Sequence, residues 1–401
     1  MNAMNQNGFY QVDYSKLEIP EVKIGMLGYG FMGQVHSNAF IKVPYSFSNP
    51  VSRPVLLAIC GRNQKKVETT ARRFGYKEYC LDWQLLAKDP QIDIFDNCTP
   101  DDCHYLPSIV AMENGKHVIC EKPLALKLEE AFQMAQKARE TGVKTMCCYN
   151  YRFLPAVQFA RQLIEQGILG KIYQFRAKYL QQQGHNPFEH IEKVWYAHGT
   201  QSGTLMGIGS HILDMAHFLV GEITAVSGLK KTYNQIRKDS SGKAHSISAD
   251  ECTIAILEFK NGAVGTIESS GVSTGRKNYQ GWEINGSKGS IVFDLEDLNH
   301  LQVYSTDANP PEIRGFSNVL VTDSEHPLPI NYLPSGHNQG WEYGHVHALH
   351  HFLDCVVNDK PVEPLGASFQ DGYRVQVVIE AINQSSAKGK RVEIKEVGQD
   401  I

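Results

Sequence analysis

The sequence predicts two domains: a doubly wound parallel sheet of the α/β class, then an α+β domain whose open, mainly antiparallel sheet is covered by helices on one face. Three observations predict this architecture. The chain has 401 residues, more than one hydrophobic core usually supports. Over the first 150 residues, short and continuously apolar segments alternate with helical patterns, as in parallel sheets buried on both faces. Beyond residue 151, apolar and polar residues alternate, which is typical of strands with one face on the core.

Five apolar segments are expected to form the parallel sheet: residues 22–27, 55–60, 92–98, 117–120 and 144–149. The clearest helix follows the fourth segment, where Leu128, Ala131, Phe132, Ala135 and Ala138 recur at helical spacing. The polar residues 1–20 are expected to be an arm. We therefore place the first domain at residues 21–150 and the second at 151–401.

The second domain is expected to begin with a helix at about residues 155–166. Asn261-Gly262 is a strong hairpin signal between two of its strands. Two closing helices are expected at about residues 341–358 and 368–385. The expected strands are residues 171–179, 222–233, 250–260, 263–270, 282–285, 290–295 and 391–394.

Composition and charge exclude several classes of protein. The 39 Lys and Arg residues against 43 Asp and Glu leave a net charge of −4, so no basic surface for nucleic acid or membrane is expected. No apolar run approaches the roughly 20 residues of a membrane span. The nine cysteines include no C-x-x-C pair, and the N-terminus carries no signal-peptide pattern. We therefore expect a cytoplasmic protein with reduced thiols.

The strongest motif is a glycine-rich loop between the first strand and the first helix. The segment Gly28-Tyr29-Gly30-Phe31-Met32-Gly33 has the spacing G-x-G-x-x-G. In that pattern Gly28 permits the tight turn, Gly30 lets a pyrophosphate approach the backbone, and Gly33 lets the helix pack on the strand. The helix N-terminus then offers N–H groups to the phosphates. The sequence therefore predicts a Rossmann domain that binds a dinucleotide.

The end of the second strand leaves the phosphorylation state of the cofactor open. An acidic residue usually binds the ribose 2′-hydroxyl there, but this chain has Gly61-Arg62-Asn63. Arg62 could pair with the 2′-phosphate of NADP or stack on the adenine of NAD, and Asn63 could bind the ribose. We expect NAD, with NADP as the alternative.

A lysine follows the strand 117–120, in Glu121-Lys122-Pro123. Ligands of doubly wound sheets bind at the carboxyl ends of the strands, so Lys122 is expected to point into that crevice. There its ammonium could exchange a proton with an alcohol or ketone oxygen. The alternative is a surface lysine at a strand end.

Taken together, these motifs resemble the Gfo/Idh/MocA oxidoreductase family over about residues 22–394. Within the family, the likeness is nearest to the levoglucosan dehydrogenase and glucoside 3-dehydrogenase branch. The further segments that carry it are Cys98-Thr99-Pro100 with His104, Asn150 with Arg152, and Gly209-Ser210-His211-Ile212-Leu213-Asp214.

The resemblance implies an enzyme that oxidises a secondary hydroxyl of a sugar, glycoside or anhydrosugar, at C3 as the favoured carbon, by hydride transfer to NAD(P). It implies that His211 is the general base, that Lys122 holds the oxygen, and that Asp214 orients His211 or binds a neighbouring hydroxyl. The residues expected to contact substrate are Lys122, Arg152, Trp195, His211, Asp214 and His337. Those expected to contact the cofactor are Gly28, Tyr29, Gly30, Phe31, Met32, Gly33, Arg62, Asn63, Thr99, Pro100, His104, Glu121, Lys122 and Asn150.

One departure from the family concerns the substrate pocket. Many members carry an aspartate four residues before the histidine, where this chain has Gly207. Gly207 is expected to leave room for a larger group such as an aglycone. Trp195, in the pair Trp195-Tyr196, could stack on a sugar ring or pack in the core.

Several alternatives stay open. His345, His347, His350 and His351 invite a metal interpretation, but no metal is predicted, because no cysteine or carboxylate lies at ligand spacing. The rivals to a dehydrogenase are a glycosidase that oxidises its sugar only transiently with bound NAD, and a non-catalytic cofactor-binding regulator. The expected partners are a carbohydrate substrate and further copies of the chain, associated through the second sheet.

Overall fold

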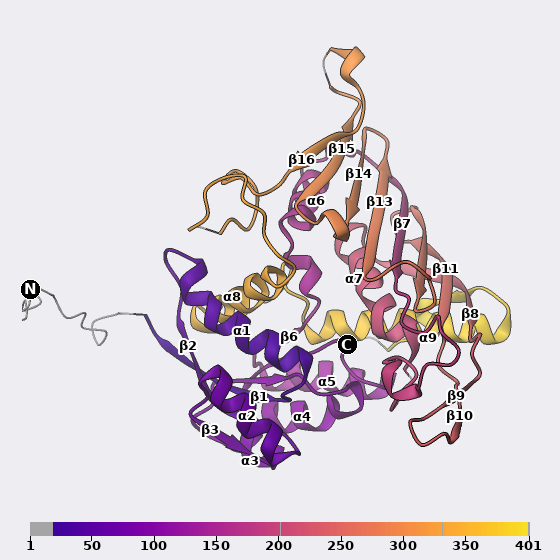
Figure 1. The fold of residues 1–401 in the computed structure, drawn as a ribbon. Coiled ribbons are helices and arrows are strands. Elements are labelled where there is room, and N and C mark those ends of the chain that lie inside the picture. The colour runs from indigo at the N-terminus through magenta and orange to yellow at the C-terminus, as the bar shows by residue number, and fades with distance from the viewer. Residues whose placement is uncertain (1–18, 201, 309, 331, 400–401) are drawn as a thin grey trace, which may run out of the picture.

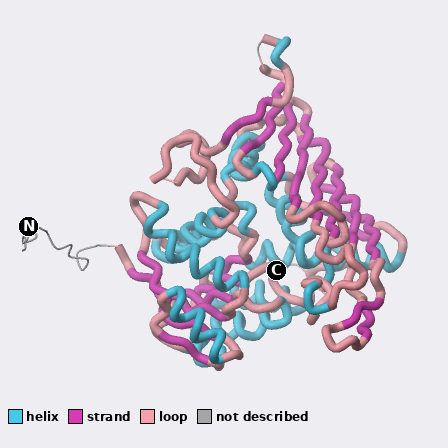
Figure 2. Tube along the Cα trace, viewed as in Figure 1, coloured by secondary structure: helices cyan, strands magenta, loops and turns pink. Residues whose placement is uncertain are grey.

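The computed structural model describes residues 19–200, 202–308, 310–330 and 332–399, which form two large sheets, a small two-stranded sheet and packed helices (Figure 1). The strands gather in two separate groups, and helices lie between them (Figure 2). The arm expected over residues 1–20 lies outside the described residues, apart from its last two positions. Within the described ranges, no helix combines the length and the apolar character needed to cross a membrane.

The first sheet has six parallel strands in the doubly wound order. A dinucleotide binds such a sheet where the strand order reverses, here beside β1. The sequence analysis did not predict β3, because this strand has three residues and none of them is buried. In spatial order the strands are β3 (Glu78–Cys80), β2 (Arg53–Cys60), β1 (Glu21–Leu27), β4 (Ile94–Asn97), β5 (His117–Cys120) and β6 (Thr145–Cys147).

Helices connect these strands. The predicted helix is α5 (Leu128–Thr141), which buries Ala131, Met134 and Ala135 and has two glutamates in its first turn. It ends at Gly142, whose φ of +68° allows its N–H to bond the Ala138 carbonyl. The other connecting helices are α1 (Phe31–Ser46), α2 (Gln64–Phe74), α3 (Trp83–Lys88) and α4 (Tyr105–Glu113).

The second sheet has nine strands and is mainly antiparallel, as predicted. The strand expected at residues 171–179 is β7, which is antiparallel to β13 but parallel to β12, so the sheet is mixed. The hairpin at Asn261-Gly262 joins β11 to β12. In spatial order the strands are β16 (Ser317–Leu320), β15 (His300–Ser305), β14 (Gly289–Asp294), β13 (Tyr279–Gly286), β7 (Ile172–Leu180), β12 (Val264–Ser270), β11 (Cys252–Phe259), β8 (Ile223–Lys231) and β17 (Val392–Glu393). The pair β9 (Ile236–Lys238) and β10 (Ala244–Ser246) lies apart from it.

Helices cover one face of this sheet. They are α6 (Pro155–Glu165), α7 (Ser210–Leu219) and α9 (Phe369–Lys388), which pack on β14 and β15, on β7, and on β8 respectively. Along β7 the inward side chains Phe175, Ala177 and Tyr179 are buried, whereas Arg176 and Lys178 are exposed. This alternation is the one that the sequence predicted.

The C-terminal helices return to the first sheet. Helix α8 (Tyr343–Val357) packs against α1, and α9 packs against α5 and β6 (Figure 1). The Gln376 side chain bonds both backbone groups of Ala125, and the Cys147 N–H donates to the Ala367 carbonyl at 2.8 Å. The two sheets are therefore held in one arrangement, with the carboxyl ends of β4 and β5 facing the second domain.

Candidate active site

The glycine-rich loop forms a cradle at the N-terminus of α1. Gly28 has φ +110°, and a Cβ there would lie 2.6 Å from the Cys98 carbonyl oxygen. A Cβ on Gly33 would lie 2.1 Å from the Gly28 oxygen, whereas one on Gly30 would meet no atom within 4 Å. The outer glycines are therefore required by packing, and Gly30 leaves open space beside a helix end without a side-chain cap. This arrangement fits a diphosphate.

The other residues predicted to bind the adenosine part of the cofactor lie around the cradle. Asn63 caps α2, since its side chain accepts from the Lys66 N–H at 3.0 Å, and Arg62 is exposed. The Tyr29 ring lies against Gly61, where a Cβ would approach it to 2.1 Å. Met32 is half-buried.

The predicted contacts after β4 support the loop that carries Lys122. His104 is buried, and its two ring nitrogens lie 2.8 Å from the carbonyl oxygens of Pro123 and Thr99. The Thr99 hydroxyl donates to Asn97 Oδ1 at 2.6 Å. Pro100 precedes the short turn that leads to His104. His104 thus joins the loop after β4 to the loop after β5.

Lys122 reaches from the first domain to the second. Its Nζ donates to the Gly207 carbonyl at 2.8 Å, and its backbone N–H donates to Glu121 Oε2 at 3.0 Å. Gly207 lies in the π-helical turn Leu205–Gly209, directly before α7. Burial opposes the ionisation of Glu121, but the adjacent His36 and Lys122 together hold its pKa at about 2. A carboxylate therefore fixes the backbone beside the ammonium.

His211 is the second residue of α7, and its ring lies among three tyrosines. The centroids of Tyr149, Tyr151 and Tyr179 lie 5.8, 4.7 and 5.8 Å from it. Its Nδ1 is buried without a hydrogen-bond partner among the described residues. Burial, followed by the charge of Lys122, lowers the pKa of His211 well below its ordinary value. The ring is therefore a neutral imidazole near an ammonium, and it can accept a proton.

Asp214 and Arg152 bond each other. Arg152 Nε lies 2.9 Å from Asp214 Oδ2, and Arg152 Nη2 lies 2.6 Å from Oδ1. Arg152 also donates to the Gly366 carbonyl and to Asp371, both at 3.2 Å. The sequence assigned Asp214 to His211 or to a substrate hydroxyl, and Arg152 to substrate. The structure gives each of them a buried ion-pair partner that braces α7, and their roles toward His211 and substrate stay predictions.

Gly207 does not leave room for an aglycone, so that expectation was wrong. A Cβ on Gly207 would lie 2.1 Å from Trp195 Cζ3, because the indole of Trp195 fills the space. Trp195 is 37% exposed, and its Nε1 donates to Gln181 Oε1 at 3.2 Å. An aromatic face therefore lies beside the acceptor of Lys122.

The sequence reasoning missed a chain of polar contacts near His211. The Tyr151 and Tyr179 hydroxyls lie 2.8 Å apart, and the Tyr179 hydroxyl and Gln181 Nε2 each donate to Asn278 Oδ1 at 2.9 Å. Trp341 Nε1 donates to the Tyr151 hydroxyl at 3.2 Å. The Trp341 ring also stacks on Phe31, which is 71% exposed. Three of these residues had a signal in the sequence. Tyr179 has an inward position on an alternating strand, Tyr179 and Gln181 belong to a segment that carries the family resemblance, and Trp341 is a weaker substrate-contact candidate in the same loop as His337.

Two further residues that the sequence predicted to contact substrate or cofactor are His337 and Asn150. His337 contacts the Pro334 carbonyl at 2.8 Å and lines a cavity of about 320 Å³, whose lining includes neither Lys122 nor His211. Asn150 is buried, and its Nδ2 has no hydrogen-bond partner in the described part of the chain.

The four histidines of α8 do not converge on one point. The rings of His347 and His350 contact Phe47, with centroids 5.5 and 3.9 Å apart, and His351 lies 2.8 Å from the Val362 carbonyl. His345 instead contacts the Cys148 thiol.

Two family models match the chain. Residues 22–149 match the NAD-binding Rossmann fold of the oxidoreductase family GFO_IDH_MocA, and residues 161–394 match the C-terminal alpha/beta domain of that family. The two matches together cover most of the chain.

Characterised relatives include three sugar or cyclitol enzymes. Levoglucosan dehydrogenase of Pseudarthrobacter phenanthrenivorans is 34% identical over 94% of this chain and 99% of its own. The scyllo-inositol 2-dehydrogenase (NAD(+)) of Bacillus subtilis is 28% identical over 90% and 94%. The D-glucoside 3-dehydrogenase of Escherichia coli is 25% identical over 84% and 90%.

The fold is shared with solved structures. Levoglucosan dehydrogenase in complex with NADH and L-sorbose superposes with a TM-score of 0.90, at 34% identity, over 95% of this chain and 100% of that one. An NAD binding oxidoreductase from Klebsiella pneumoniae superposes with a TM-score of 0.87, at 31% identity, over 95% and 100%.

Proposed function

We propose, since the chain belongs to the Gfo/Idh/MocA oxidoreductase family, that it oxidises a secondary hydroxyl of a sugar, glycoside or anhydrosugar with NAD. One observation carries the proposal. The Lys122 ammonium, from the end of β5, reaches the turn that leads into His211, whose imidazole is neutral. A proton acceptor and a cation therefore lie near each other between the two domains.

His211 and Lys122 have different roles at the substrate oxygen. His211 removes the hydroxyl proton, because a neutral imidazole can accept it at neutral pH. Lys122 holds the oxygen, since its ammonium has three donors and Gly207 accepts only one. Nicotinamide, when bound, supplies the acceptor for the hydride. The reacting carbon that we propose is C3, by analogy with the glucoside 3-dehydrogenase relative.

The substrate pocket that we propose has an aromatic side and a polar side. The indole of Trp195 offers a face for the apolar side of a pyranose ring. The hydroxyls of Tyr151 and Tyr179, together with Asn278, offer donors and acceptors for sugar hydroxyls. Such a pocket suits a neutral carbohydrate, as in the levoglucosan dehydrogenase complex with L-sorbose.

For the cofactor we propose NAD rather than NADP. The Gly28–Gly33 cradle suits the diphosphate of either, and Asn63 is engaged as a helix cap. Arg62 would then stack on the adenine rather than pair with a phosphate. If NAD is the cofactor, Arg62→Ala weakens NAD binding several-fold, and kcat/KM with NADP stays below that with NAD in both proteins. A wild-type preference for NADP would contradict this.

The roles of the two domains, self-association and the cellular location are also proposals. We propose that residues 21–150 hold the cofactor and that residues 151–401 supply the substrate pocket and the surface for self-association. All nine cysteines are free, which supports a cytoplasmic location.

The test is turnover of a sugar panel by single variants. Purified protein is mixed with NAD and with levoglucosan, methyl glucosides or inositols, and NADH absorbance is followed. Lys122→Ala and His211→Asn each lower kcat by about 10²–10⁴-fold, because each removes a group that handles the reacting proton. Cofactor affinity, measured by protein fluorescence, changes little. Lys127→Ala, at an exposed position directly before α5, serves as the matched control.

Three outcomes separate the candidates. Loss of kcat with retained NAD affinity supports the dehydrogenase. Release of free sugar from a glucoside, without net NADH, indicates the glycosidase. Wild-type turnover by Lys122→Ala contradicts the assignment of the site.

A further inference from the structure

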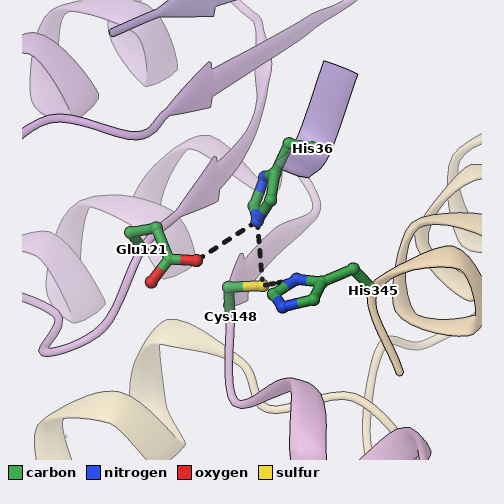
Figure 3. Close-up of side chains that lie close together, drawn as sticks. All are labelled: His36, Glu121, Cys148 and His345. Atoms are coloured by element: carbon green, nitrogen blue, oxygen red, sulfur yellow. Dashed lines mark hydrogen bonds and ion pairs between the residues drawn. The ribbon is translucent and has the colours of Figure 1, made fainter. Parts of the chain in front are cut away.

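Four side chains from four segments of the chain lie close together (Figure 3). His36 comes from α1, Glu121 from the end of β5, Cys148 from the chain just after β6, and His345 from α8. All four are buried. Glu121 directly precedes Lys122 in the chain, and the catalytic proposal uses none of the four residues as a reacting group.

The spacing of these side chains is that of metal ligands. His36 Nε2 lies 3.2 Å from Glu121 Oε1 and 3.5 Å from Cys148 Sγ, and His345 Nδ1 lies 3.8 Å from that sulfur. One ligand atom from each residue lies within 4.8 Å of the other three. Tetrahedral zinc, with bonds of about 2.0–2.3 Å, separates its ligands by about 3.3–3.8 Å. The four atoms therefore need little movement to enclose an ion.

The surroundings of the cluster also suit a metal. His36 Nδ1 lies 2.8 Å from Asp96 Oδ2, the carboxylate–histidine arrangement that orients histidine ligands. Glu121 is held through Oε2 by the Lys122 N–H. Glu121 Oε1 lies against His36 Nε2, so the partner of this buried carboxylate oxygen is itself one of the four ligand atoms. His345 Nε2 is buried without a hydrogen-bond partner in the described part of the chain. A metal ion between the four ligand atoms would give the buried carboxylate a stronger partner than the imidazole.

We propose that His36, Glu121, Cys148 and His345 bind one divalent transition-metal ion, Zn²⁺ by the chemistry of the ligands. Two neutral imidazoles, a thiolate and a carboxylate are ligands that zinc accepts, and the two anions neutralise its charge. Binding forms two metal–nitrogen bonds, one metal–sulfur bond and one metal–oxygen bond. The proton of the Cys148 thiol, and the one that His36 carries toward Glu121, go to solvent, and no electron is transferred.

Such an ion is structural, because four protein ligands leave no open position for substrate. It ties the helix of the glycine cradle to the strand end that carries Lys122 and to α8. Because the ligands are buried, the ion enters as the chain folds, and its binding stabilises the folded state.

The competing explanation is an ion pair without metal. Burial disfavours a charged His36, but the adjacent Asp96 carboxylate and the other groups around the ring raise its pKa well above the ordinary value. An imidazolium between Asp96 and Glu121 accounts for those three side chains. It does not require a thiol at position 148 or a histidine at 345, and these two residues therefore decide the test.

The experiment compares neighbouring buried cysteines. Untagged wild type, Cys148→Ala and Cys147→Ala are refolded with Co²⁺, a spectroscopic substitute for Zn²⁺, and desalted. Wild type and Cys147→Ala are expected to retain about one ion per chain and to show the thiolate charge-transfer band and the visible bands of tetrahedral Co²⁺. Cys148→Ala loses the charge-transfer band. Cys147 is a matched control, since it is as buried as Cys148 but packs in the hydrophobic core.

A second pair of variants tests the histidine. His345→Asn retains about 10-fold less Zn²⁺ than wild type after refolding and dialysis, whereas His347→Asn, on the same helix and equally buried, retains the wild-type amount. The melting temperature of wild type is higher after refolding with Zn²⁺ than with chelator, and that difference disappears in Cys148→Ala. A wild-type protein without bound metal, or equal effects within either pair, overturns the proposal. Metal content and spectra are read without turnover, so the result is independent of the proposed function.

Discussion

Gly207 and Trp195 illustrate how single residues shape the site. The glycine provides the carbonyl that Lys122 bonds, and the absence of its Cβ admits the indole. The pair therefore acts as a unit: the size of one side chain decides the position of the other. Substitutions at the two positions should not be additive.

We predict a measurable coupling between these positions. Gly207→Ala displaces the indole and lowers kcat/KM by about 10-fold or more, because the Lys122 acceptor moves with it. Trp195→Ala removes the obstacle, so the double variant resembles Trp195→Ala, with a coupling energy of about 1–2 kcal/mol. Gly315→Ala is the control, since a Cβ there meets nothing within 4 Å. Strictly additive effects in the kinetic double-mutant cycle would contradict the contact.

His217, on the same helix as His211, predicts a pH dependence of stability. Burial lowers the pKa of His217 to about 4, from 6.5 in an unfolded chain. Between these values the unfolded state binds more protons, so stability is lost as the pH falls from 6.5 toward 4.

The expected size of this loss is about 2 kcal/mol between pH 7 and pH 5. Urea unfolding of wild type and His217→Asn at the two pH values isolates it, because the other titrating groups are common to both proteins. The variant should lose less stability on acidification. An equal loss in both proteins would show that His217 is not protonated on unfolding.

At the scale of elements, one guanidinium joins three segments. Arg152 belongs to the short 3-10 turn Asn150–Phe153, Asp214 to α7 and Asp371 to the first turn of α9. The Arg152 and Asp214 side chains are 4% and 0% exposed. Removing one partner from such a pair leaves a buried charge without compensation.

We therefore predict that Asp214→Asn lowers the free energy of unfolding by about 3–5 kcal/mol. Asp371→Asn is the matched control and costs less, because Asp371 bonds Arg152 through one oxygen and is 17% exposed. Denaturant titrations of both variants measure the difference. If kcat of Asp214→Asn under stabilising conditions fell as far as that of His211→Asn, a direct catalytic role for Asp214 would replace this one.

At the scale of the whole molecule, the second sheet has one helix-covered face and one exposed face. On the exposed face, Leu229 of β8 lies beside Ile254 of β11, and Ile256 follows two residues on. These three side chains are 58%, 50% and 53% exposed. Neighbouring large apolar residues on an open sheet are typical of an interface.

We predict that this face joins copies of the chain. The double substitution Ile254→Lys and Ile256→Lys shifts the protein to monomer in sedimentation velocity, because it buries two charges in the contact, while circular dichroism stays unchanged. Leu85→Lys on α3, at a residue that is 65% exposed, leaves the association state unchanged. An unchanged sedimentation coefficient in the double variant would exclude this face.

The features that depend on local pattern could be predicted from the sequence. Every strand of the first sheet except β3, the cradle Gly28–Gly33 and the position of Lys122 after β5 follow from apolar runs and glycine spacing, because a strand end and a helix start are local events. Membership of the family followed from the combination of those motifs. The expectation of His211 as the base came from that resemblance.

Contacts between residues far apart in the chain could not be predicted from the sequence. Arg152 pairs with Asp214 across 62 positions, Lys122 bonds Gly207 across 85, and Cys148 contacts His345 across 197. The same holds for the parallel pairing of β7 with β12 and for Trp195 on Gly207. Such contacts result from the packing of whole elements, in which any inward polar group must find a partner, and no local spacing encodes which partner that is.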